Sequence, residues 1–116
     1  MVITQLPADS WQLYKNLRLE ALTTEPLAFG SSYQEEVAFT PTEWQNRLNI
    51  MWFALKDNTP VGMIGFLQNT GLATKHHALL VSIYVQPTYQ QQGIGTQLIR
   101  HIQSIAPRNN VCKLSL

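Results

Sequence analysis

The sequence contains few charged residues and only one cysteine. Charged residues make up 13% of its 116 positions, compared with about 25% in an average protein, and the formal net charge is +1. This near-neutral balance argues against a broad electrostatic surface for nucleic acid, which requires a strongly basic face. The lone cysteine, Cys112, cannot form an internal disulfide, which suits a reducing compartment, and we expect it to be a half-buried strand residue.

The sequence also lacks the features of exported, membrane-spanning and zinc-binding proteins. No stretch approaches the roughly 20 apolar residues of a membrane-spanning helix, and the N-terminus has no secretory signal. The histidines and the cysteine do not follow a zinc-like spacing, so we predict no metal site. We therefore expect a cytoplasmic protein without membrane association. Its length and 45% hydrophobic content predict a single domain over residues 1–116.

Two helices are predicted in the first half of the chain. Apolar residues recur at helical spacing over residues 11–22, with Asp9 or Ser10 as the capping residue. A second helix is predicted over residues 40–49, because the segment TPTE is a capping box with proline at the first helical position. The segment 29–37 between these helices has no clear period and is expected to be a loop.

The second half of the chain is predicted to be rich in strands. Four runs of apolar and β-branched residues predict strands over 51–55, 61–67, 79–85 and 111–116. The first two flank a turn-forming segment and are expected to form an antiparallel hairpin, in which Gly62 and Gly65 indicate a bulge or a close backbone approach. An amphipathic helix over 94–105 separates the last two strands, which predicts a parallel pair with a right-handed crossover. The expected fold class is therefore α/β, an α+β mixed sheet with helices on both faces.

The turn before the predicted helix 94–105 has the properties of an anion site. The first turn of a helix presents backbone N–H groups without helical partners, and these groups bind phosphate. Gly93 and Gly95 leave room for an anion to approach, although two glycines by themselves fit a tight turn equally well. A Rossmann fingerprint is excluded because its third glycine would fall at Leu98 and no acidic residue follows Gly95.

The segment IYVQPTYQQQGIGTQLI resembles motif A of the GNAT superfamily of N-acetyltransferases, whose pattern is Gln/Arg-x-x-Gly-x-Gly/Ala. Gln90, Gly93 and Gly95 occupy the three defined positions, and the order of predicted elements agrees over nearly the whole chain. The resemblance implies a GNAT-like acyltransferase fold. It also implies an enzyme that transfers an acetyl group from acetyl-CoA to a primary amine in a ternary complex.

The resemblance further implies which residues bind the cosubstrate. In the family, amides of this loop bind the coenzyme A pyrophosphate, and the preceding strand flanks the pantetheine arm. The implied cofactor-binding residues are Ile83, Tyr84, Val85, Gln90, Gln91, Gln92, Gly93, Ile94, Gly95 and Thr96. Many members carry arginine and glycine at the first two loop positions, where this chain has Gln90 and Gln91.

The groups that handle protons and bind the acceptor are less defined. Many family members have a glutamate on the fourth strand, where this chain has Ala78-Leu79-Leu80. The candidates for a base are His76, His77, Glu35 and Glu36. The histidines are better explained as a solvated pair before a strand, and the glutamates as part of a charged loop. Tyr33 and Glu35 lie where the family places segments that contact the acceptor.

Family members usually continue after the fifth strand with another helix and two strands, which commonly carry a tyrosine that protonates the leaving thiolate. The sequence ends at Leu116, before such a segment. We expect one of three explanations: a second chain completes the site in a homodimer, the chain is a fragment, or it is a non-catalytic module. Such a module would bind coenzyme A or pair with another chain.

Overall fold

The computed structural model describes residues 1–27, 29, 31–68, 77–106 and 113–115. Within them, five strands form one sheet in the order β1-β2-β3-β4-β5. Their bounds are β1 (Val2–Thr4), β2 (Met51–Lys56), β3 (Thr59–Gln68), β4 (His77–Val85) and β5 (Lys113–Ser115). The first four strands pair antiparallel, and β5 pairs parallel to β4. The predicted mixed sheet and its parallel final pair are therefore confirmed.

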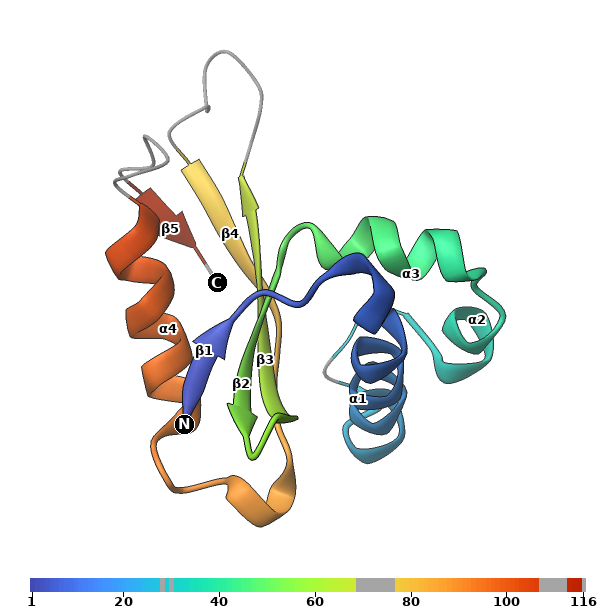
Figure 1. Ribbon diagram of the computed structural model, residues 1–116, viewed down its shortest axis with the longest axis horizontal. Coiled ribbons are helices and arrows are strands. Elements are labelled where there is room, and N and C mark those ends of the chain that lie inside the picture. Colours follow the sequence, from blue (N-terminus) through green and yellow to red (C-terminus); the bar gives the residue numbers. More distant parts are fainter. Residues whose placement is uncertain (28, 30, 69–76, 107–112, 116) are drawn as a thin grey trace.

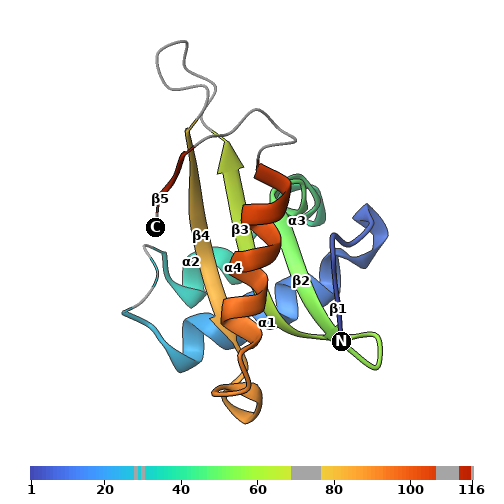
Figure 2. The same cartoon turned by 90° about the vertical axis from the view of Figure 1, so that its left-hand side faces the viewer.

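Helices cover both faces of the sheet, as predicted. Their bounds are α1 (Trp11–Thr24), α2 (Tyr33–Val37), α3 (Pro41–Leu48) and α4 (Ile94–Ile105), with short 3-10 turns η1 (Ala8–Ser10) and η2 (Pro87–Tyr89). Helix α4 lies on one face, and α1, α2 and α3 lie on the other (Figures 1 and 2). The sheet therefore separates two apolar layers.

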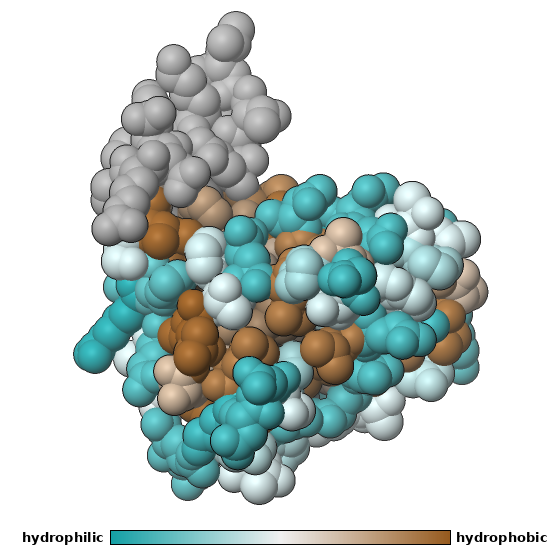
Figure 3. All heavy atoms as spheres, viewed as in Figure 1, coloured by the Kyte–Doolittle hydropathy of each residue, from teal (hydrophilic) through white to brown (hydrophobic). Residues whose placement is uncertain are grey.

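Each layer has its own buried cluster. The cluster under α1 and α3 contains Tyr14, Leu17, Ala21, Trp44, Leu48, Met51, Phe53, Met63 and Tyr84. The cluster under α4 contains Ala54, Val61, Ile64, Leu80, Ile94, Leu98 and Ile102. In the space-filling view, apolar side chains reach the surface in the middle of the face, between α4 and the helices of the other layer (Figure 3). The two clusters therefore lie on opposite faces of the central strands.

The predicted helix boundaries are largely confirmed. Helix α4 has the bounds that the sequence predicts, and α1 continues two residues beyond the predicted end. Thr40 caps α3, because its hydroxyl accepts a hydrogen bond of 3.2 Å from the Glu43 amide. Ser10 lies at the N-cap position of α1, but its side chain makes no capping hydrogen bond. No helix in the described ranges is long and apolar enough to span a bilayer.

Two elements were not predicted. Strand β1 is only three residues long and pairs with β2 at the sheet edge. The segment 29–37 was expected to be a loop, but it contains α2, whose N-cap Ser32 accepts a hydrogen bond of 3.2 Å from the Glu35 amide. Ser32 and Glu35 have the same spacing as a capping box, and that spacing was the available signal. Of the predicted last strand, residues 111, 112 and 116 lie outside the described residues.

The two glycines of β3 mark close contacts, as predicted. A Cβ added at Gly62 would lie 3.2 Å from Ile94 Cγ2, so this glycine lets α4 approach the sheet. A Cβ added at Gly65 would lie 2.6 Å from Val81 Cγ2, at the point where the pairing of β3 with β4 shifts. These contacts place the start of α4 directly beside the end of β4.

Candidate functional site

The chain between β4 and α4 forms a loop with two left-handed residues. After η2, Gln91 has a φ of 66° and Gly93 has a φ of 79°. The Gln90 side chain donates a hydrogen bond of 3.0 Å to the carbonyl of Val85, the last residue of β4. Alternation of left-handed and other conformations turns successive backbone N–H groups toward one side, which produces an anion-binding concavity. The backbone of this loop can therefore form such a concavity.

The amides at the start of α4 are available to a ligand. The first hydrogen bond of the helix runs from the Gln97 amide to the Gly93 carbonyl, at 2.9 Å. None of the described residues accepts a hydrogen bond from the amides of residues 93–96. A Cβ added at Gly93 would meet no atom within 4 Å, and one at Gly95 would meet only Val85 Cγ2, at 3.9 Å. The space in front of these amides is therefore open.

A cavity of about 340 Å³ lies over this loop and the end of β4. It is lined by Glu25, Ile83, Tyr84, Val85, Tyr89, Gln90, Gln91, Gly93, Ile94 and Gly95. Of the residues predicted to bind the cofactor, only Gln92 and Thr96 do not line it. Glu25 and Tyr89 were missed. No signal in the sequence identified Glu25, because it directly follows α1 and is distant in sequence from the motif. Tyr89 lies inside the motif itself.

One edge of β4 is open beside this cavity. Strand β5 pairs only with residues 77–79, whereas β3 pairs with β4 along its length to Val85. Residues 80–85 therefore have no strand on the β5 side within the described part of the chain. Free backbone groups on this edge can hydrogen-bond an extended ligand, as an added strand would.

Tyr84 connects this strand to α1. Its hydroxyl donates a hydrogen bond of 2.7 Å to Glu20 Oε2, and Gln86 donates one of 3.0 Å to Glu20 Oε1. Burial, supported by the hydrogen bond to Glu20, raises the pKa of Tyr84 to about 12. A phenol with this pKa stays protonated at neutral pH, so Tyr84 serves as a fixed donor to Glu20.

The candidate bases and acceptor contacts are not gathered in the cavity. His76 lies outside the described residues, and His77 is the first residue of β4, distant in sequence from the loop. Tyr33 and Glu35 are exposed on α2, and neither lines the cavity. Glu35 accepts a hydrogen bond of 3.4 Å from the Ser31 hydroxyl.

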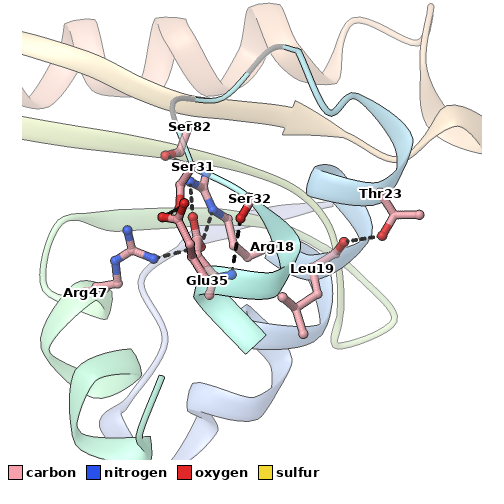
Figure 4. Close-up of polar contacts among 9 residues, drawn as sticks. Arg18, Leu19, Thr23, Ser31, Ser32, Glu35, Arg47 and Ser82 are labelled. Atoms are coloured by element: carbon pink, nitrogen blue, oxygen red, sulfur yellow. Dashed lines mark hydrogen bonds and ion pairs between the residues drawn. The ribbon is translucent and has the colours of Figure 1, made fainter. Parts of the chain in front are cut away.

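From the sequence, Glu36 is expected to lie in a charged loop. In the structure it lies in α2 and is fully buried. Arg18 donates to both of its carboxylate oxygens at 2.9 Å, and Arg47 donates to Oε1 at 2.9 Å. Figure 4 shows Arg18 and Arg47 converging on this point from α1 and α3. Burial opposes ionisation, but the hydrogen bonds and charge of Arg18, with Arg47, lower the pKa of Glu36 below its usual value. This carboxylate is therefore committed to an ion pair and cannot readily accept a proton.

Solved structures of acetyltransferases have the same fold. A GNAT-family acetyltransferase from Streptococcus pneumoniae superposes with a TM-score of 0.77 at 15% identity, covering 95% of this chain and 69% of that one. A predicted acetyltransferase from Clostridium acetobutylicum, solved with acetyl-CoA, has a TM-score of 0.70 at 18% identity, covering 99% and 79%. The PaiA N-acetyltransferase from Thermoplasma acidophilum, solved with coenzyme A, has a TM-score of 0.75 at 16% identity, covering 95% and 74%.

Comparison of the sequence with curated proteins gives no match. The model of the acetyltransferase (GNAT) family, in contrast, matches residues 11–116. This match includes every element from α1 to β5, together with the loop that presents its amides to the cavity. The chain belongs to the GNAT family of acetyltransferases.

Proposed function

We propose that this protein is an acetyl-CoA-dependent N-acetyltransferase that acts on a primary amine. The observation that supports this proposal best is the row of open amides at residues 93–96, beside a cavity and an edge of β4 that has no neighbouring strand among the described residues. Two structures with the same fold were solved with acetyl-CoA and with coenzyme A, which agrees with this assignment.

The residues present fit the cosubstrate in two ways. The amides of 93–96 would hold the diphosphate, because several N–H donors and the positive end of α4 converge on one anion. The edge of β4 at Ile83 to Val85 has no neighbouring strand within the described residues and would pair with the amide groups of the pantetheine arm, for which the Gln90 side chain would have to leave the Val85 carbonyl. Acetyl-CoA would supply the acetyl group as a thioester: the neutral amine nitrogen forms a C–N bond to the carbonyl carbon, the C–S bond breaks, and coenzyme A leaves as its thiol with the proton that the nitrogen loses.

An amine acceptor also fits the charge of the cavity. Among the described residues that line it, only Glu25 is charged. A carboxylate attracts the protonated form of an amine and favours its binding over that of an anionic acceptor. We propose that one of Glu25, Glu35, His76 and His77 accepts the proton released on transfer; substituting each residue and measuring the pH profile of transfer identifies it.

The test replaces Gly95 by leucine and measures acetyl-CoA binding by isothermal titration calorimetry. A side chain at this position fits the fold, because its Cβ would meet only Val85 Cγ2, at 3.9 Å, but it would fill the space before the amides. We expect binding at least about tenfold weaker, with thermal stability preserved, since the loss of one or two amide contacts costs about 1.4 kcal/mol or more. Gly93 is less suitable because its φ of 79° would strain any side chain.

The matched control is Gln97→Ala, at an exposed position of the same helix that does not line the cavity and whose amide already donates to the Gly93 carbonyl. It should bind acetyl-CoA like the wild type. Normal binding by the Gly95→Leu variant would contradict the proposed site. ATP provides the ligand control, since a general phosphate site would bind it as tightly as coenzyme A.

Catalysis is tested separately, by measuring free thiol released from acetyl-CoA in the presence of a panel of amines. Binding without transfer to any amine would favour the alternative of a non-catalytic module that binds coenzyme A. The homodimer stays a prediction, and light scattering that shows a monomer at high concentration would contradict it.

A further inference from the structure

Strand β4 contains one extra residue next to the candidate site. Gly65 pairs with Val81 and Met63 pairs with Tyr84, so two steps along β3 correspond to three steps along β4. Ser82 lies inside this bulge with a φ of 55°, in the left-handed region. A bulge of this kind changes which face each later side chain occupies.

The effect on the following residues is visible in the two apolar layers. Leu80 and Ile83 both pack in the layer under α4, although they are three residues apart and would face opposite sides of a regular strand. Tyr84 packs in the layer under α1, and Val85 packs again under α4. The bulge therefore sets the orientation of Ile83, Tyr84 and Val85, which line the cavity.

Serine is an unfavourable residue for this backbone conformation, but its side chain is held in place. A left-handed conformation brings the Cβ of such a residue too close to the following carbonyl oxygen. The Ser82 hydroxyl accepts a hydrogen bond of 3.0 Å from Arg18 Nη1. Arg18 is itself only 5% exposed, and its other two nitrogens are bound to Glu36 at 2.9 Å each. The two-point contact to Glu36 fixes the guanidinium plane and leaves Nη1 directed at the bulge (Figure 4).

We propose that Arg18 is a positioning residue for the acetyl-CoA site: it holds the bulge at Ser82 and thereby the orientation of residues 83–85. The inference rests on the proposed function, because the affected residues are those assigned to the pantetheine arm. Through Glu36, the same guanidinium joins the bulge to α2, which carries the predicted acceptor contacts Tyr33 and Glu35. The acceptor segment and the cosubstrate strand are therefore coupled through one buried side chain.

The first experiment compares Ser82→Ala with Ser82→Gly. Both variants lose the hydroxyl, but only glycine adopts a positive φ without strain. We expect Ser82→Ala to bind acetyl-CoA about tenfold more weakly, which corresponds to about 1.4 kcal/mol of backbone strain, and Ser82→Gly to bind within about twofold of the wild type. Normal binding by Ser82→Ala, or equal weakening in both variants, would overturn the proposal.

The second experiment tests Arg18 itself. Arg18→Lys keeps a cation beside Glu36 but cannot reach two carboxylate oxygens and Ser82 together. We expect weaker acetyl-CoA binding and lower stability in Arg18→Lys. In the double variant Arg18→Lys/Ser82→Gly, we expect binding to return to within about twofold of the wild type while the stability loss remains. A merely structural role would give a double variant that binds no better than Arg18→Lys.

A measurement without ligand separates this inference from the proposed function. Amide chemical shifts of Ile83, Tyr84 and Val85 should move in Arg18→Lys and return toward wild-type values in the double variant. If the wild type does not bind acetyl-CoA, the proposed function fails, whereas these shifts still decide whether Arg18 holds the bulge. Unchanged shifts in Arg18→Lys would overturn the inference even where acetyl-CoA binds.

Discussion

Replacing Glu36 by glutamine should destabilise the protein strongly. The glutamine keeps the shape of the side chain but removes the carboxylate that, in the part of the chain that the structure describes, both Arg18 and Arg47 contact. Breaking a buried ion pair from one side costs about 3–5 kcal/mol, because an uncompensated charge stays buried. We expect the free energy of unfolding to fall by about 3 kcal/mol, since Arg18 is buried but the Arg47 side chain is 37% exposed and can be hydrated. The whole chain has a stability of only about 6–17 kcal/mol by the usual scaling per residue.

Urea unfolding followed by tryptophan fluorescence measures this loss. With a slope of about 1–3 kcal/mol per molar urea, a loss of about 3 kcal/mol lowers the midpoint by at least about 1 M. Glu35→Gln is the matched control, because the neighbouring carboxylate is exposed and accepts only a long bond from Ser31. It should change stability by less than about 0.5 kcal/mol. Equal effects of the two substitutions would refute the reasoning.

The same variant has a defined pH signature. Because the pKa of Glu36 is lower in the folded state than its usual 4.5, its ion pair stabilises the fold above that pH. The stabilisation declines as the pH falls below 4.5 and through the folded-state pKa. The difference in unfolding free energy between wild type and Glu36→Gln should therefore be constant near neutral pH and narrow below pH 4.5. A difference that grows on acidification would contradict the assignment of the lowered pKa.

Three further outcomes are expected. Gln91→Gly should raise stability by up to about 1 kcal/mol in thermal unfolding without weakening acetyl-CoA binding, because the loop requires a φ of 66° there. In a spectrophotometric titration, Tyr84 should ionise near pH 12, so Tyr84→Phe should remove the component that titrates at the highest pH. The stability that Tyr84 provides is present below pH 10 and is lost as the pH rises through 12. Lys56→Met should weaken acetyl-CoA binding by up to about fivefold at low salt and by less at high salt, because Lys56 Nζ lies 3.3 Å from Gln92 Oε1 beside the loop; an effect independent of salt would indicate a packing role.

The backbone of the site was predictable because it is determined locally. Two glycines, a β-branched run before them and a clean apolar stripe after them specify the strand, loop and helix within about twenty residues. The bounds of α4 were correct for this reason. Helix α2 was missed although Ser32 and Glu35 carried a local signal, because the segment is too short to show apolar periodicity.

The polar interior was not predictable, because it depends on contacts between residues distant in sequence. Arg18 and Glu36 are 18 residues apart, and Arg18 and Ser82 are 64 apart. Charged side chains are almost never fully buried unless they are paired, and a sequence does not identify the partner. Ser82 carried no signal for a positive φ, which local patterns assign to glycine, asparagine or aspartate. The loop could therefore be predicted from its own residues, whereas the contacts of Arg18 with Glu36 and Ser82 could be found only in the structure.

The buried polar residues of α1 do not line the cavity. The division of the molecule into two layers explains how α1 can still affect that cavity. Strand β4 belongs to both layers, since Ser82 and Tyr84 contact α1 through Arg18 and Glu20, whereas Ile83 and Val85 pack under α4. A strand shifted by one residue exchanges its faces completely, so it has two discrete arrangements and few intermediate ones. A contact from α1 that selects one arrangement therefore sets the orientation of the side chains under α4, without touching a ligand there. For this reason, substitutions at Arg18 should change acetyl-CoA affinity and stability by separable amounts, whereas substitutions in the layer under α1 that do not reach β4 should change stability alone.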